Sequence, residues 1–319
     1  MKQNASPPWL ARCLFVGIAA QLYIVIYGRT RTFWWDEVYT LAAAAIGRPV
    51  EWDFVLRDVH PPTYYMLVRG LGLTTGMDDF GLRSINLLAL PPALGAFWIL
   101  REVFNSRKLA LLAVLFLCNY FVLFLSVDLR SYAITMCLGL LAHSALLLEL
   151  MGKRPRTAIL IGACTGLWAL HFFGAGIGLA ILAVSVVHGW RTGMSRRQIA
   201  ARIAAILVLG LLFVFWVVGV SNALDMTGGN LWIRNTPKPL IDFLGWQSIA
   251  FATLISALVV RRRSPAEAVP NAALWILLPS AMLLTVAVLV SFHTPVISSR
   301  NTSYFVAGTL LAITLYVPD

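Results

Sequence analysis

Long apolar runs alternate with short polar segments along almost the whole chain. Most runs are long enough to cross a bilayer as a helix, which takes about 17 to 25 residues. The predicted spans are residues 9–28, 82–100, 109–125, 131–150, 157–170, 172–190, 199–220, 241–260, 271–291 and 303–318. The pattern therefore predicts an all-α fold, a polytopic transmembrane helical bundle of about ten spans. We expect residues 1–319 to form a single transmembrane domain, with no soluble C-terminal domain.

The segment between the first two spans breaks this pattern. Residues 29–62 form a polar loop, and seven of the 14 acidic residues lie between Asp36 and Asp79. The apolar residues after Glu37 have helical spacing, and acidic residues at a helix N-terminus are favoured by the helix dipole. We therefore expect a short amphipathic helix that lies along the outer membrane surface. Residues 63–75 are apolar but short, and we expect them to stay at the interface rather than to cross.

The composition and the charge distribution agree with a membrane location. The chain is 59% hydrophobic and 12% charged, whereas soluble domains carry roughly 25% charged residues. The net charge of +11 comes largely from short loops between spans, so it indicates the positive-inside bias rather than nucleic-acid binding. The basic groups are Arg101, Arg107 and Lys108; Lys153, Arg154 and Arg156; Arg191, Arg196 and Arg197; and Arg261 to Arg263. If these loops are cytoplasmic, the loop of residues 29–62 lies on the outer face.

Two groups of polar residues in this outer loop are candidates for chemistry. Asp36 or Glu37 could deprotonate an acceptor hydroxyl, or the pair could simply form the acidic first turn of a helix. His60 follows Asp58 and precedes two prolines that fix the backbone, so it could bind phosphate or carry a proton. The alternative for this histidine is a solvated position at the entry to a helix.

Further candidates lie at the outer ends of later spans. Asp128, Arg130 and Tyr132 occupy the boundary between two spans, where a charged pair is costly unless it is paired or functional. The outer or boundary cations could bind a lipid phosphate, or could extend to the headgroups as ordinary snorkelling side chains. These cations are Arg83, Arg234, Lys238 and Arg300.

An ordered set of short motifs resembles a known group of enzymes. The motifs are WWDE, DVHPPTYY, GLRS, SVDLRSYAI, LHFF and SSRNTSYF. In this order and with this hydropathy, the chain resembles bacterial membrane glycosyltransferases of the GT-C superfamily, related to protein O-mannosyltransferases and lipid A aminoarabinose transferases. The resemblance implies transfer of a sugar from a polyprenyl-phosphate donor to an acceptor hydroxyl on the periplasmic face, usually with inversion.

The resemblance also implies roles for individual residues. The acidic catalytic residue of the family's first outer loop corresponds to Asp36, with Glu37 beside it, and the family's HPP segment begins at His60. The remaining matched positions are Asp128, Arg130, Tyr132, His171 and, more loosely, Arg300. We therefore expect Asp36 and Glu37 to be the catalytic carboxylates, with Asp36 as the general base, and the other polar residues to bind the substrate.

The expected location is the bacterial inner membrane, and the expected partners are a polyprenyl-phosphate-linked sugar, membrane lipid and an acceptor lipid, glycan or protein. Nucleic acid is not expected. The mechanism requires no cofactor, although it leaves the use of a divalent metal open. Two other functions remain as alternatives. The chain could transport a lipid-linked sugar, or it could be a catalytically inactive partner subunit, because Phe172 stands where the family has tyrosine.

Overall fold

The computed structural model describes residues 8–30, 32–56, 58, 60–76, 78–226, 268–291 and 301–317, and within these ranges all regular structure is helical. The helices before the long bundle helices are α1 (Pro8–Thr30), α2 (Trp35–Ala44), α3 (Trp52–Leu56), α4 (Pro62–Thr75), α5 (Asp79–Arg83) and the 3-10 helix η1 (Ser84–Ala89). The bundle continues with α6 (Leu90–Leu100), α7 (Ser106–Leu117), α8 (Tyr120–Leu125), α9 (Tyr132–Leu150), α10 (Thr157–Leu170) and α11 (Phe172–Arg191). The last described elements are α12 (Arg196–Met226), α14 (Ala268–Ser291), the 3-10 helix η2 (Asn301–Phe305) and α15 (Val306–Tyr316).

The prediction of an all-helical fold is confirmed within these ranges, and the helices support the predicted membrane location. Five helical segments are long and apolar enough to cross a membrane, namely Gly81–Leu100, Tyr132–Leu150, Phe172–Arg191, Arg196–Gly219 and Asn271–Val290. Two shorter apolar helices, Thr157–Leu170 and Ser303–Tyr316, accompany them. The predicted number of about ten spans is not established by these segments, and the predicted span 241–260 lies outside the described residues.

One predicted span is interrupted. Residues 109–125 were expected to be continuous, but α7 ends at Leu117 and α8 begins at Tyr120. The side chain of Asn119 accepts a hydrogen bond from the backbone N–H of Phe121 at 2.9 Å. An asparagine that bonds to nearby backbone in this way competes with the helix and caps a new one, which explains the break.

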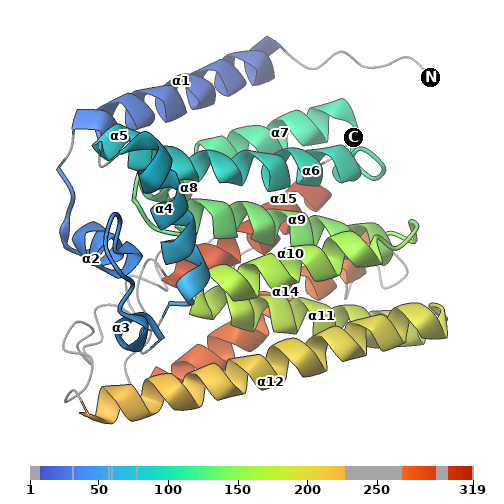
Figure 1. Cartoon of the computed structure of the whole chain (residues 1–319). Coiled ribbons are helices and arrows are strands. Elements are labelled where there is room, and N and C mark those ends of the chain that lie inside the picture. Colours follow the sequence, from blue (N-terminus) through green and yellow to red (C-terminus); the bar gives the residue numbers. More distant parts are fainter. Residues whose placement is uncertain are drawn as a thin grey trace.

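The long helices lie side by side (Figure 1), and basic and acidic loops lie at opposite ends of the bundle. Loops 101–105, 151–156 and 192–195 lie at one end of the bundle, which we call the basic end, with three of the four basic groups in or beside them. The acidic segment with α2 and α3 lies at the opposite end, the first-loop end. This separation is the one that the positive-inside pattern requires. The fourth basic group, residues 261–263, lies outside the described residues.

Helix α4 runs across the ends of the bundle helices rather than alongside them (Figure 1). This direction agrees with the expectation that residues 63–75 lie at the interface. The helix expected after Glu37 is also present, since α2 carries Asp36 and Glu37 in its first turn and buries Thr40, Ala43 and Ala44. Its buried face packs against α4.

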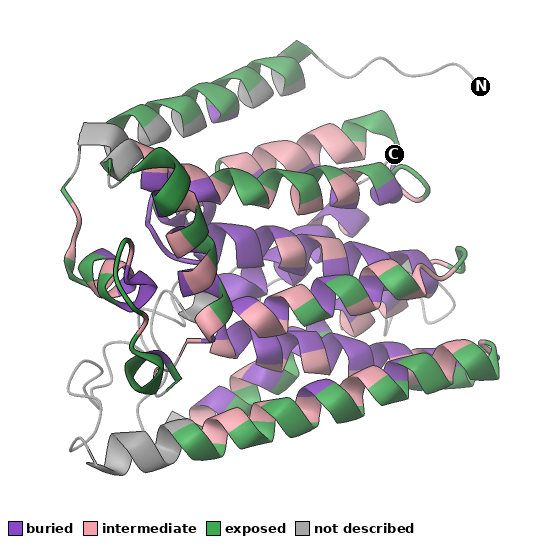
Figure 2. Cartoon of the chain, in the orientation of Figure 1, coloured by how far each residue is buried: buried purple, intermediate pink, exposed green. Residues whose placement is uncertain are grey.

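Helix α9 is the centre of the bundle and α12 is at its rim (Figure 2). In their most apolar 18-residue windows, 83% of the residues of α9 are buried but only 11% of those of α12. Small residues permit close helix contacts elsewhere. A Cβ atom at Gly174 of α11 would lie 2.5 Å from the carbonyl oxygen of Leu167 in α10, so the two backbones touch there.

A buried ion pair joins the helices near the basic end. Arg202 of α12 donates to both carboxylate oxygens of Glu149 in α9, at 2.6 and 2.8 Å, and neither side chain is more than 1% exposed. The same guanidinium donates to Ser185 of α11 and to Thr157 of α10. This network connects four helices and anchors α12, whose outward face is otherwise apolar and exposed.

Candidate functional site

The first-loop end of the bundle brings together most of the residues that the sequence singled out. The structure describes nine of them, namely Asp36, Glu37, Asp58, His60, Arg83, Asp128, Arg130, Tyr132 and His171. The other three, Arg234, Lys238 and Arg300, lie outside the described residues. The nine come from four separate parts of the chain, so the cluster exists only in the folded protein.

Glu37 and Arg83 form a two-pronged ion pair. Arg83 Nε donates to Glu37 Oε1 at 3.0 Å, and Arg83 Nη2 donates to Oε2 at 2.8 Å. The carboxylate is completely buried and also accepts the backbone N–H groups of Trp34 and Leu129, at 3.1 and 2.7 Å. Burial favours a raised pKa for Glu37, but the bonds from Arg83 and the two backbone groups outweigh burial and hold the pKa below its usual value. This partnership argues against the expectation that Arg83 meets a substrate phosphate.

The loop of residues 126–131 is fixed by several such contacts. Besides the bond from Leu129 to Glu37, Asn86 Nδ2 donates to the carbonyl oxygens of Ser126 and Asp128, at 2.7 and 2.9 Å. The side chain of Asp128 is fully buried. These bonds determine where the next residue, Arg130, enters the site.

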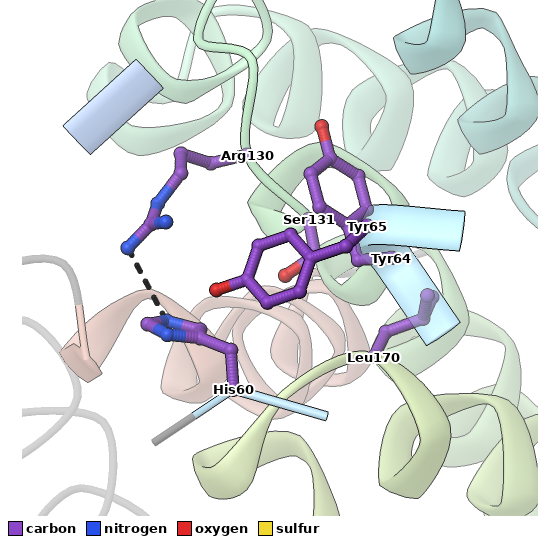
Figure 3. A pocket seen from close by; sticks show the side chains of 6 residues that line it. All are labelled: His60, Tyr64, Tyr65, Arg130, Ser131 and Leu170. Atoms are coloured by element: carbon purple, nitrogen blue, oxygen red, sulfur yellow. Dashed lines mark hydrogen bonds between the residues drawn. The ribbon is translucent and has the colours of Figure 1, made fainter. Parts of the chain in front are cut away.

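Arg130 reaches across the site to the first loop (Figure 3). Its Nη1 donates to Thr40 Oγ1 at 3.1 Å and to the backbone carbonyl of Asp36 at 3.5 Å, and its Nη2 lies 3.4 Å from His60 Nε2. The residue is 8% exposed. All of these direct partners are neutral, in contrast to the carboxylate partners of the other two buried arginines in the described ranges, Arg83 and Arg202.

His60 is held between Arg130 and Asp58. Its Nδ1 lies 3.4 Å from Asp58 Oδ2, and that carboxylate also accepts the hydroxyl of Tyr65. Burial and the charge of Arg130 lower the pKa of His60, and the nearby Asp58 only partly offsets them. For Asp58, burial favours a raised pKa, but His60, Tyr65 and Arg130 outweigh it and the pKa lies below its usual value.

His171 belongs to an aromatic cluster behind this pair. Its ring centroid lies 4.8 Å from that of His60, 5.1 Å from Tyr304 and 5.2 Å from Tyr132. Its Nδ1 accepts the backbone N–H of Phe173 at 3.2 Å, so this histidine also caps the start of α11. The capping bond places the ring proton on Nε2, a buried atom that has no hydrogen-bond partner among the residues that the structure describes.

Asp36 occupies the first turn of α2, beside Arg130 and half-buried. Its charge lies close enough to influence the titration of both Arg130 and His60. The two neighbouring acidic residues therefore have different surroundings. Glu37 is engaged by the scaffold, while Asp36 stays at the edge of the polar cluster.

A narrow pocket lies where these groups converge (Figure 3). It is lined by His60, Tyr64, Tyr65, Arg130, Ser131 and Leu170. In this conformation it is too narrow for a sugar ring, so it marks the meeting point of the polar groups rather than an open substrate cavity. Among the described residues, no group of three or more His, Cys, Asp or Glu side chains could hold a metal ion.

Several residues at the site were not among the sequence-based candidates. Thr40 and Tyr65 contact Arg130 and Asp58 directly, and Tyr304 packs on His171. Trp216 of α12 donates its indole N–H to the carbonyl oxygen of Asp58 at 3.3 Å. Spacing could have suggested only Thr40, four residues after Asp36 and thus on the same helical face.

No protein-family model, curated protein or solved structure matches this chain.

Proposed function

We propose that this protein is a membrane glycosyltransferase that moves a sugar from a polyprenyl-phosphate donor to an acceptor hydroxyl at the first-loop end. One observation carries the proposal. Among the described residues, Arg130 is a buried cation that contacts neutral groups, namely Thr40, His60 and the backbone carbonyl of Asp36, and the charge of Asp36 is close enough to act on it. A buried guanidinium with no carboxylate partner in the described part of the chain is suited to bind an anion such as a phosphate.

In the proposed reaction, the phosphate of the donor binds at Arg130. The acceptor hydroxyl oxygen attacks the anomeric carbon, the bond between that carbon and the phosphate oxygen breaks, and polyprenyl phosphate leaves. Arg130 balances the negative charge that develops on the leaving oxygen, and a preorganised cation is most effective where water is scarce. The thin hydrogen-bonding shell of Thr40 and His60 holds the guanidinium in place without neutralising it.

Asp36 takes the proton that the acceptor hydroxyl loses. A carboxylate suits this task because it accepts a proton only as the attacking oxygen becomes acidic in the transition state. Tyr64 and Tyr65 are 2% and 0% exposed, so they line the site and do not anchor the protein at the membrane surface. We assign them to the walls of the sugar subsite. Proposals for Arg234, Lys238 and Arg300 as further phosphate ligands rest on the sequence alone.

Donor binding by purified protein tests this role of Arg130. The variants are Arg130→Gln and, as a control, Arg154→Gln, which changes an exposed arginine at the basic end. We expect Arg130→Gln to weaken binding of a polyprenyl-phosphate sugar by about 10- to 100-fold, the value of one or two charge-assisted hydrogen bonds. The control variant should bind like wild type. Equal binding by both variants would refute the assignment.

A second experiment separates transfer from transport. The donor carries a radiolabelled sugar, and wild-type protein is reconstituted in liposomes with an acceptor extract. Label that appears on acceptor material supports the transferase. Label that crosses the bilayer while still attached to the polyprenyl phosphate would instead identify a lipid-linked sugar transporter.

A further inference from the structure

The neighbours Asp36 and Glu37 have opposite surroundings. Asp36 is half-buried beside Arg130, whereas Glu37 points into the scaffold and is completely buried. Each oxygen of Glu37 accepts at least two hydrogen bonds. Oε1 accepts Arg83 Nε at 3.0 Å and the N–H of Leu129 at 2.7 Å. Oε2 accepts Arg83 Nη2 at 2.8 Å and the N–H of Trp34 at 3.1 Å. A carboxylate with this many donors is a poor proton acceptor.

These donors come from three separate segments. Trp34 immediately precedes α2, Arg83 ends α5, and Leu129 lies in the loop that carries Arg130. The bond from Leu129 spans 92 positions of sequence. Asp36 directly precedes Glu37 in the chain, and Arg130 directly follows Leu129. The bond between Glu37 and Leu129 therefore links the backbone next to Asp36 to the backbone next to Arg130. The guanidinium of Arg83 also stacks over the ring of Phe33, 4.7 Å from its centroid, so the segment before α2 contacts the same ion pair.

We propose that Glu37 and Arg83 are positioning residues, which hold the Asp36 carboxylate and the Arg130 guanidinium at a fixed separation. This inference rests on the proposed function, because it explains how the proposed base and phosphate ligand are kept in register. It assigns no proton transfer to Glu37. Loss of the Glu37–Arg83 pair is expected to lower kcat, since displacing reacting groups by ~1 Å costs on the order of 100-fold in rate.

The protein contains a matched control for this idea. Glu149 and Arg202 form an equally buried two-pronged pair, but near the basic end, and within the described residues their further hydrogen-bond partners are Ser185 of α11 and Thr157 of α10. Removing the charge of either glutamate disturbs one buried ion pair. Only the change at Glu37 also weakens a bond from the loop that carries Arg130, because a neutral glutamine amide accepts the Leu129 N–H less strongly than a carboxylate does.

The experiment compares Glu37→Gln with Glu149→Gln in purified, monodisperse protein, with two readouts. The first is hydrogen–deuterium exchange of peptides that cover residues 126–131, and the second is kcat and KM for sugar transfer. For Glu37→Gln we expect faster exchange in this loop and a loss of kcat of about 100-fold. For Glu149→Gln we expect unchanged exchange in the loop and transfer close to that of wild type.

Unchanged exchange in Glu37→Gln, or equal kcat losses in the two variants, would overturn the positioning role. If Glu37→Gln does not fold, Arg83→Lys replaces it, because lysine keeps the charge but cannot donate from two positions of a planar fork. If wild-type protein transfers no sugar, the proposed function fails, and the exchange readout alone still decides whether Glu37 holds the loop.

Discussion

Arg130 Nη2 lies 3.4 Å from His60 Nε2, although the two residues are 70 positions apart in the chain. Arginine only donates hydrogen bonds, so Nε2 must be the accepting nitrogen of a neutral ring. The ring proton is then on Nδ1, which faces the carboxylate of Asp58 at 3.4 Å. The geometry thus selects one tautomer and one charge state of His60.

This geometry predicts that the folded protein loses stability in acid. The pKa of His60 lies below its usual 6.5, because burial and Arg130 disfavour the charged ring more than Asp58 and Asp36 favour it. Between the lowered pKa and 6.5, the unfolded chain binds more protons than the folded one. The stability that the neutral ring supplies is therefore complete above pH 6.5 and is lost as the pH falls towards the folded-state pKa.

We expect transfer to persist through pH 6.5 and to fall in more acidic buffer, once Nε2 carries a proton towards Arg130. The measurement is the pH dependence of kcat/KM in wild type and in His60→Gln. Glutamine places an acceptor that does not titrate near the position of Nε2, so its acidic limb should move to lower pH. His171 is present in both proteins, so an identical acidic limb in the two would assign the titration to another group.

The contact between α10 and α11 predicts a steric effect on stability. In Gly174→Ala the new Cβ would meet the carbonyl oxygen of Leu167 at 2.5 Å, and backbone cannot move aside as a side chain can. We expect a loss of about 1–3 kcal/mol, the usual cost of overpacking, and a lower Tm in detergent. Gly162→Ala on α10 is the control, because a Cβ there meets nothing within 4 Å. Similar Tm values for the two variants would show that the helices are not in contact at Gly174.

The ion pair near the basic end predicts a strongly asymmetric mutational response. Arg202→Met leaves Glu149 buried without its partner, which costs about 3–5 kcal/mol for a broken buried pair. The double variant with Glu149→Met should recover most of this loss, because two apolar side chains can replace a buried pair. Arg197→Met removes an exposed charge from the same helix and should change stability little. Thermal unfolding in detergent measures all three; a single and double variant of equal Tm would contradict the pairing.

Hydropathy predicted much of the helical architecture, because a membrane-spanning helix faces either lipid or other helices and is therefore apolar along its whole length. It also predicted α2, since the acidic first turn after Trp35 is a local signal. It failed at Asn119, where one side chain divides an apolar run that still reads as continuous. The separation of basic loops from the acidic first loop was likewise visible in the sequence.

The pairing of the site residues was not predictable. Sequence identified Asp36, Glu37 and Arg83 as candidates, but only the fold shows that Glu37 binds Arg83 across 46 positions and leaves Asp36 at the site. Tyr304 and Trp216 gave no signal, because an aromatic residue in an apolar membrane helix is unremarkable in composition. Contacts between distant segments depend on packing, which a single sequence does not display.

The most direct test of the account is transfer of a radiolabelled sugar in membranes that contain wild type, Asp36→Asn or Glu51→Gln, each supplied with a panel of polyprenyl-phosphate sugars. Glu51→Gln is the control because Glu51 is an exposed carboxylate of the same loop. We predict that wild type and Glu51→Gln transfer the label alike, and that Asp36→Asn loses about 100-fold or more of the rate, the typical contribution of a general base. Full transfer by Asp36→Asn would contradict the assignment of the base, and absence of transfer by wild type with every donor would contradict the proposed function itself.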